Sequence, residues 1–184
     1  MNTKTKKIIL AALLIALSMV LTRFLSANLP ISGNNSIRLS IGFFPIMLAG
    51  IILGPVYGMA VGAAADLLGY FVNSSGGAYF PPITLTSALV GLVAYLVYRL
   101  ASKWPEWLRL LLCVAVTQIL CSMLLQTLWL SMLYGDAYFV LFPLRALAAL
   151  ILIPVNFIII RSVIAALRAA KLIEPSVRQV PAAR

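Results

Sequence analysis

The stretch from Ile37 to Val72, IRLSIGFFPIMLAGIILGPVYGMAVGAAADLLGYFV, decides the class of this protein, because its 36 residues carry only two charged side chains. A Gly54-Pro55 pair divides the stretch, and such a pair is typical of a tight turn. We therefore predict one helix over about Ile37–Leu53 and a second over about Val56–Val72. Both segments are apolar enough to lie in a lipid bilayer.

The whole chain has the same character. Of its 184 residues, 63% are apolar and 10% are charged, whereas a soluble domain has about a quarter of its residues charged. This apolar content suffices for about six spans of roughly 20 residues each. The net charge of +10 is therefore interpreted as a sign of membrane topology, and nucleic acid is not an expected partner.

We predict an all-α integral membrane protein with a single six-helix domain, residues 1–173, and a polar cytoplasmic tail, residues 174–184. The first apolar run follows a lysine cluster, as a signal peptide does, but it has no small-residue cleavage site and is expected to be retained. The polar stretches Ser26–Ser36 and Asn73–Pro82 are expected to be loops. The predicted spans are about residues 8–25, 37–53, 56–72, 83–100, 108–133 and 138–163.

The lysines and arginines predict the orientation, since they concentrate on the cytoplasmic side of membrane proteins. With the N-terminus inside, eleven of the fourteen fall on the cytoplasmic side: Lys4, Lys6, Lys7, Arg99, Lys103, Arg109, Arg161, Arg168, Lys171, Arg178 and Arg184. The remaining three, Arg23, Arg38 and Arg145, fall in the outer halves of their helices. Both termini are therefore predicted to be cytoplasmic.

Several kinds of chemistry have no motif in this chain. It contains no histidine, no phosphate-binding loop and no GxSxG sequence, so ATP hydrolysis and familiar metal or serine catalysis are not expected. Cys113 and Cys121 lie in one apolar run without a second pair and are interpreted as packing residues. We predict neither an enzyme nor a cofactor nor a metal site, and any energy must come from another subunit.

Asp66 is the principal candidate for a functional residue. It lies about ten residues into the third predicted helix, roughly 15 Å at about 1.5 Å per residue, and ionisable groups at that depth are costly. Two interpretations remain open: an ion pair with Arg23, Arg38 or Arg145, or contact with a ligand. Because the arginines outnumber the acid on that side, the surplus positive charge favours an anionic ligand.

Helical spacing predicts further polar and small-residue stripes. Gln118, Ser122, Gln126 and Trp129 share one face of the fifth helix. Interhelical hydrogen bonding explains such a stripe equally well, although Gln126 and Trp129 lie further out and favour a site. In the third helix, Asp66 lies on the same side as three glycines, which are interpreted as packing residues: Gly58, Gly62 and Gly69.

Residues 38–88 closely resemble a known family. The matching elements are RLSIGFFPI (38–46), Gly50, Gly54-Pro55, Gly58, GAAAD (62–66), Leu68-Gly69 and GGAYFPPITLTSA (76–88). They resemble the substrate-binding S components of energy-coupling factor (ECF) vitamin importers, specifically the folate family, FolT. The chain departs from that pattern at Pro82, where a glycine is expected.

The resemblance implies a subunit of a prokaryotic plasma membrane that binds folate outside and delivers it inward. Its implied partners are a transmembrane coupling protein and two ATP-binding-cassette ATPases, and the pair Ala12 and Ala16 resembles the docking motif for the coupling protein. Asp66 is then expected to accept hydrogen bonds from the pterin, and the three outer arginines to bind the glutamate carboxylates.

Stacking on the ligand's rings is expected from aromatic side chains, namely Tyr70, Tyr79, Phe80 and Trp129. The ligand could also lie in the reverse orientation. Arg23, Arg145, Gln126 and Trp129 would discriminate folate from another vitamin or small heterocycle. A ligand-free structural membrane protein is the remaining alternative, in which Asp66 simply pairs with an arginine.

Overall fold

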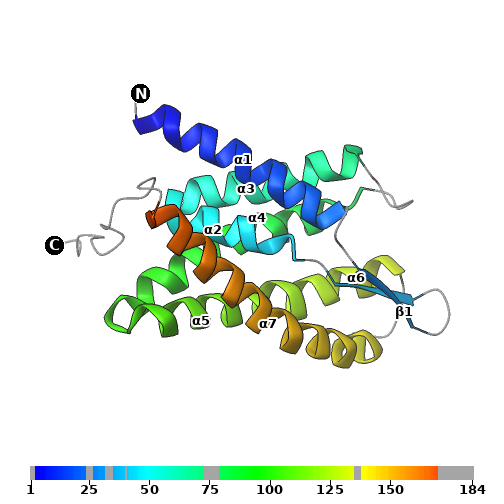
Figure 1. Ribbon diagram of the computed structural model, residues 1–184. Coiled ribbons are helices and arrows are strands. Elements are labelled where there is room, and N and C mark those ends of the chain that lie inside the picture. Colours follow the sequence, from blue (N-terminus) through cyan, green and yellow to red (C-terminus); the bar gives the residue numbers. More distant parts are fainter. Residues whose placement is uncertain are drawn as a thin grey trace.

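The computed structural model describes residues 3–23, 27–31, 35–39, 41–72, 79–134 and 138–169. Its helices form a bundle in which successive passes run in opposite directions (Figure 1). The described start of the first helix and the described end of the last lie at the same end of this bundle. The predicted tail, residues 174–184, lies outside the described residues.

Short connections join the helical elements, except for residues 24–42 between the first two helices. Their bounds are α1 Thr3–Arg23, α2 Phe43–Leu53, α3 Pro55–Val72, α4 Pro81–Leu100, the 3-10 turn η1 Ala101–Lys103, α5 Glu106–Thr117, the π-helical stretch η2 Gln118–Leu125, α6 Gln126–Tyr134 and α7 Tyr138–Ala169. The elements α5, η2 and α6 continue directly into one another and form a single pass.

Within the described residues, five stretches are long and apolar enough to cross a membrane: Lys4–Thr22, Pro55–Val72, Pro81–Lys103, Glu106–Met132 and Arg145–Ala169. The sixth pass is the shorter apolar helix α2. The prediction of a helical membrane protein is thus confirmed. Pro81 and Pro82 occupy the first two positions of α4, where their missing N–H groups remove no intrahelical hydrogen bond.

The predicted start of the second helix at Ile37 is wrong. Residues Ala27–Ile31 form strand β1 and Asn35–Leu39 form strand β2, paired antiparallel with Asn28 opposite Arg38. The helix begins only at Phe43, after Gly42. The physical reason is the alternation of apolar and polar residues over 36–39, a period of two that favours a strand over a helix.

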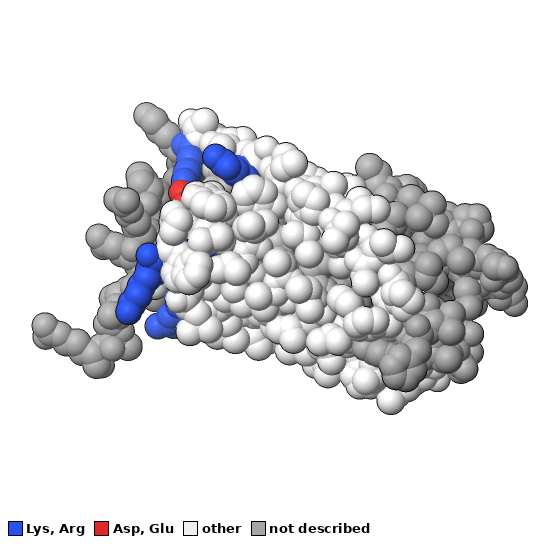
Figure 2. Space-filling model, turned by 90° about the horizontal axis from the view of Figure 1, so that it is seen from below, with Lys and Arg blue, Asp and Glu red and all other residues white. Residues whose placement is uncertain are grey.

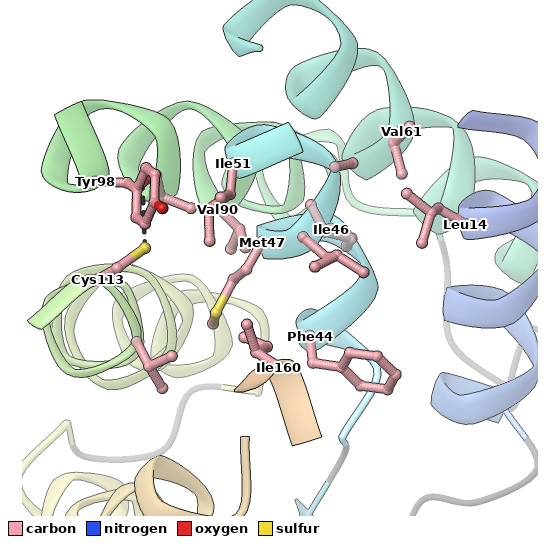
Figure 3. Packing of buried hydrophobic residues seen from close by; sticks show 14 of the residues in the cluster. Leu14, Phe44, Ile46, Met47, Ile51, Val61, Val90, Tyr98, Cys113 and Ile160 are labelled. Carbon is pink, nitrogen blue, oxygen red and sulfur yellow. Dashed lines mark hydrogen bonds between the residues drawn. The ribbon is translucent and has the colours of Figure 1, made fainter. Parts of the chain in front are cut away.

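Helix α2 forms the centre of the bundle. Nine of its eleven residues are buried, and it packs against α1, α3, α4 and α7. Figure 3 shows Met47 pointing toward Ile160 of α7, while Leu14 of α1 approaches Val61 of α3. Met47 and Ile160 are fully buried. The apolar face of every surrounding helix therefore meets α2 or its immediate neighbours.

Glycines allow α2, α3 and α4 to approach one another closely. A Cβ atom on Gly91 would lie 2.3 Å from the backbone of Gly58, and one on Gly62 would lie 2.1 Å from the carbonyl oxygen of Ser87. No side-chain rotation relieves a clash with backbone atoms. The interpretation of Gly58 and Gly62 as packing residues is confirmed, and small residues serve this purpose in membrane bundles generally.

Figure 2 shows lysines and arginines gathered at one end of the bundle, and Figure 1 shows that α1 begins and α7 ends there. Arg168 of α7 forms an ion pair with Glu106 at the start of α5. The guanidinium of Arg109 lies 3.6 Å from the ring centroid of Tyr98. These contacts tie α4, α5 and α7 together at that end.

Candidate functional site

The first two turns of α4 lie between a carboxylate on one side and an indole on the other. Thr84 and Thr86 are two residues apart, hence about 200° apart around the helix at roughly 3.6 residues per turn. Thr84 therefore faces α3, and Thr86 faces α6. Both side chains are buried, with exposed fractions of 8% and 1%.

Asp66 of α3 is held by a hydroxyl group. The Oγ1 atom of Thr84 donates to Oδ2 of Asp66 at 2.6 Å, and the hydroxyl of Tyr79 lies 2.9 Å from the same Oγ1 atom. The Tyr79 ring in turn packs against Tyr70, with centroids 5.3 Å apart. Among the described side chains Asp66 forms no ion pair. Of the three arginines considered as its partner, the one whose side chain is described, Arg145, therefore does not pair with it.

Trp129 of α6 is held in the same manner. Its indole Nε1 donates to Oγ1 of Thr86 at 3.0 Å, and Thr86 donates to the carbonyl oxygen of Pro82 at 3.0 Å. Phe80, directly before α4, approaches the indole edge-on, with ring centroids 6.5 Å apart and an interplanar angle of 62°. The Phe80 and Trp129 rings, both predicted as site residues, are therefore brought together.

Arg145 of α7 contacts the π-helical region. Its Nη1 atom donates to the backbone carbonyl of Ser122 at 3.3 Å and to Oε1 of Gln126 at 3.4 Å. The wider turns of η2 displace carbonyl groups from the regular α-helical ladder, and such stretches occur frequently at functional sites. Arg145 and Gln126, both predicted as site residues, are thus neighbours. Arg145 is partly buried and forms no ion pair among the described side chains.

The remaining predicted residues are the arginines Arg23 and Arg38 and the alanines Ala12 and Ala16. Arg23 ends α1 and Arg38 lies in β2, and the side chains of both are outside the described part of the molecule. Ala12 and Ala16 are exposed on α1, which leaves this pair accessible to a partner. The fully buried amides of Gln118 and Asn156 have no hydrogen-bond partner among the described residues.

Comparison with known proteins places this arrangement in a family. The family model for the ECF transporter, substrate-specific component, matches residues 6–167. The chain belongs to this ECF substrate-specific component family. A curated relative, the folate transporter FolT of Clostridium novyi (strain NT), is 39% identical over 157 residues, which are 85% of this chain and 87% of the relative.

Other members of the ECF substrate-specific component family extend the comparison. The folate transporter FolT of Leuconostoc mesenteroides is 29% identical over 134 residues, 73% of this chain and 68% of the relative. A crystal structure of FolT bound with folic acid matches with a TM-score of 0.67 and 30% identity, covering 84% of this chain and 88% of that one. The S component for biotin from an ECF-type ABC transporter shares the fold, with a TM-score of 0.62 at 20% identity over 93% of this chain and 95% of that one.

Thr84 and Thr86 bond to the predicted site residues Asp66 and Trp129 but were not themselves predicted as site residues. A threonine in a transmembrane helix ordinarily bonds to the carbonyl four residues earlier, as Thr86 does with Pro82, so hydroxyl groups there are read as structural. Their spacing could have indicated this role. Two hydroxyl groups two residues apart on a helix face opposite neighbouring helices, here α3 and α6, and both of these helices carry predicted site residues.

Proposed function

We propose that this chain is the folate-binding S component of an ECF-type vitamin importer. One observation carries the proposal: Asp66, Trp129 and Arg145, three side-chain types suited to the three parts of folate, are all held by hydrogen bonds to neighbouring helices. The 39% identity to a curated folate transporter and the likeness to FolT bound with folic acid support it.

The chemistry of folate fits these groups. The pterin presents an N3–H and a 2-amino group side by side, and a carboxylate such as Asp66 accepts two parallel hydrogen bonds. The glutamate end carries two carboxylates, for which arginine is the best-suited partner. We assign Arg145 to that end, together with Arg23 and Arg38, and Gln126 beside Arg145 adds a neutral donor.

The aromatic residues suit the rings of the ligand. Phe80 and Trp129 lie edge to face. A flat ring of the ligand that stacks on either side chain buries apolar surface and makes favourable quadrupole contacts. Tyr70 and Tyr79 form a second aromatic pair beside Asp66. We assign this pair to the pterin and the Phe80–Trp129 pair to the benzoyl ring.

The partners follow from the family. We propose that Ala12 and Ala16 on the exposed face of α1 dock on the transmembrane coupling protein, which assembles with two ATP-binding-cassette ATPases. This chain then has no catalytic activity, and its partners hydrolyse ATP. The gathering of lysines and arginines at the end of the bundle where α1 begins and α7 ends (Figures 1 and 2) supports an orientation with both termini in the cytoplasm. We assign the chain to a prokaryotic plasma membrane on the basis of its family.

Equilibrium binding to the detergent-purified chain, without other subunits, tests this function. Folate should quench the tryptophan fluorescence saturably, after correction for its own absorbance, and calorimetry should give the same Kd. Thiamine, riboflavin, pantothenate and biotin should have no effect. A response to one of these alone would change the ligand, and silence to all would favour a ligand-free membrane protein.

A matched pair of variants locates the response. Trp129 contacts Phe80 and Thr86 in the site, whereas Trp107 is the second residue of α5, at the charged end, and is 53% exposed. Trp129→Phe should therefore remove most of the folate-dependent quenching. Trp107→Phe should retain it. The reverse result would place the ligand at the other end of the molecule.

A further inference from the structure

The hydrogen bonds around Thr84 run in one direction. A threonine hydroxyl has a single proton, and Thr84 donates it to Oδ2 of Asp66 at 2.6 Å. Its contact with Tyr79 at 2.9 Å must then be a bond that Thr84 accepts. The hydroxyl of Tyr79 is consequently the donor, and the chain of donation is Tyr79 to Thr84 to Asp66.

This direction determines what Asp66 can still bind. An ionised carboxylate has about four acceptor positions on its two oxygens, and Thr84 occupies one on Oδ2. No donor other than Thr84 is found for Asp66 among the described residues. Both oxygens of Asp66 can therefore accept further hydrogen bonds, while the bond from Thr84 restrains the orientation of the carboxylate plane.

Fixing that plane has a consequence for recognition. The terminal torsion of an aspartate is broad and roughly two-fold, so an unrestrained carboxylate presents its two oxygens in many orientations. Two parallel donors need both oxygens in one plane with them, whereas a single donor binds either oxygen in any orientation. A restraint on Asp66 therefore favours a ligand edge with paired donors over one with a single donor.

We propose that Thr84 is a positioning residue that sets the specificity of the site for a ligand edge with two adjacent N–H donors. This inference rests on the proposed function and adds to it a residue that does not itself touch the ligand. Its burial and its direct bond to Asp66 carry the argument. The adjacent Thr86, which faces Trp129, is not part of it.

The test compares two ligands and four forms of the purified full chain. The ligands are folic acid and its analogue with hydrogen in place of the 2-amino group, which has a single donor at that edge. The forms are the wild type, Thr84→Val, Thr84→Ser and Thr117→Val. Thr117 is a fully buried threonine of α5 outside the site, so it controls for the loss of a buried hydroxyl.

The readout is the ratio of the two Kd values from calorimetry. The wild type should prefer folic acid, and Thr84→Val should reduce that preference by about tenfold, the equivalent of one hydrogen bond to a charged group. Thr84→Ser, which keeps the hydroxyl, should restore the preference, and Thr117→Val should leave it unchanged. A purely structural role for Thr84 would weaken both ligands equally.

Three results would overturn the inference: an unchanged ratio in Thr84→Val, an equal loss of affinity for both ligands, or failure of Thr84→Ser to restore the preference. If Thr84→Val does not fold, Thr84→Ala gives the same comparison with less bulk. Failure of the wild type to bind folic acid has a different meaning, because it refutes the proposed function itself.

Discussion

Substitution of Gly62 by alanine should weaken both ligand binding and stability. A Cβ atom at this position would lie 2.1 Å from the carbonyl oxygen of Ser87, whereas ordinary van der Waals contact begins at 3.4 Å. The clash is with backbone, so α3 and α4 have to move apart by the difference, about 1.3 Å. The structure thus defines both the direction and the size of the perturbation.

The displacement reaches the site, because Asp66 lies one turn beyond Gly62 on α3 and Thr84 lies three residues before Ser87 on α4. Adding the shift to the 2.6 Å bond between Thr84 and Asp66 carries it past the hydrogen-bond limit of roughly 3.5 Å. A bond to a charged group contributes about 1.5–3 kcal/mol. Its loss should raise the Kd for folate roughly 10- to 100-fold.

Stability should fall as well, because the lost bond joins α3 to α4 in the unliganded protein. Overpacking costs about 1–3 kcal/mol more, and the preference of a helix interior for alanine over glycine, about 0.8–1 kcal/mol, offsets part of the loss. Calorimetry with folate and thermal unfolding in detergent measure the two quantities separately. Ala60→Leu, which adds bulk on the exposed face of α3, is the control and should change neither. An unchanged Kd in Gly62→Ala would refute the tight α3–α4 crossing and its link to the site.

Four further predictions follow. Arg145→Gln should raise the Kd for folate at least tenfold while the protein stays folded, because glutamine cannot make the bidentate, charge-assisted contact of an arginine with a carboxylate. Aggregation of this variant would instead indicate that Arg145 stabilises the fold. Asn156→Leu should raise the free energy of unfolding by about 1–3 kcal/mol, since the buried amide has no hydrogen-bond partner among the described residues. A lower melting temperature would instead show that the amide is hydrogen-bonded in the folded protein. Gly54→Ala should cost about 1–3 kcal/mol in thermal unfolding, because Gly54 has φ +100° and ψ 178°, a backbone region almost confined to glycine, and Gly54→Asn should cost as much. The double variant Ala12→Trp and Ala16→Trp should bind folate normally but block uptake in cells that supply the other subunits, and unimpaired uptake would exclude the docking role.

Long-range features of this fold were predictable from composition and spacing. The six passes follow from apolar runs, and the packing role of Gly58 and Gly62 follows from their position on one face of α3. Both inferences depend on hydropathy and on regular α-helical geometry, which holds in α3.

Features that depend on competition between local structures were not predictable. Apolar character continues from Ile37 into α2, so hydropathy alone extends the helix backward, and only the two-residue alternation marks β2. The π-helical turns of η2 change the phase of the face that carries Gln118, so regular α-helical spacing does not describe its surroundings. The role of Thr84 depends on which of two possible acceptors its proton finds, which no spacing rule determines.

The shortness of α2 bears on how this protein is made. Eleven residues span about 16 Å at roughly 1.5 Å per residue, about half of the 30 Å hydrocarbon thickness of a typical bilayer. A helix of that length does not insert stably by itself, yet a single residue, Gly54, joins it to α3. We therefore expect α2 and α3 to enter the membrane together as one hairpin, so that the central helix of the finished bundle depends on its neighbour for insertion as well as for packing.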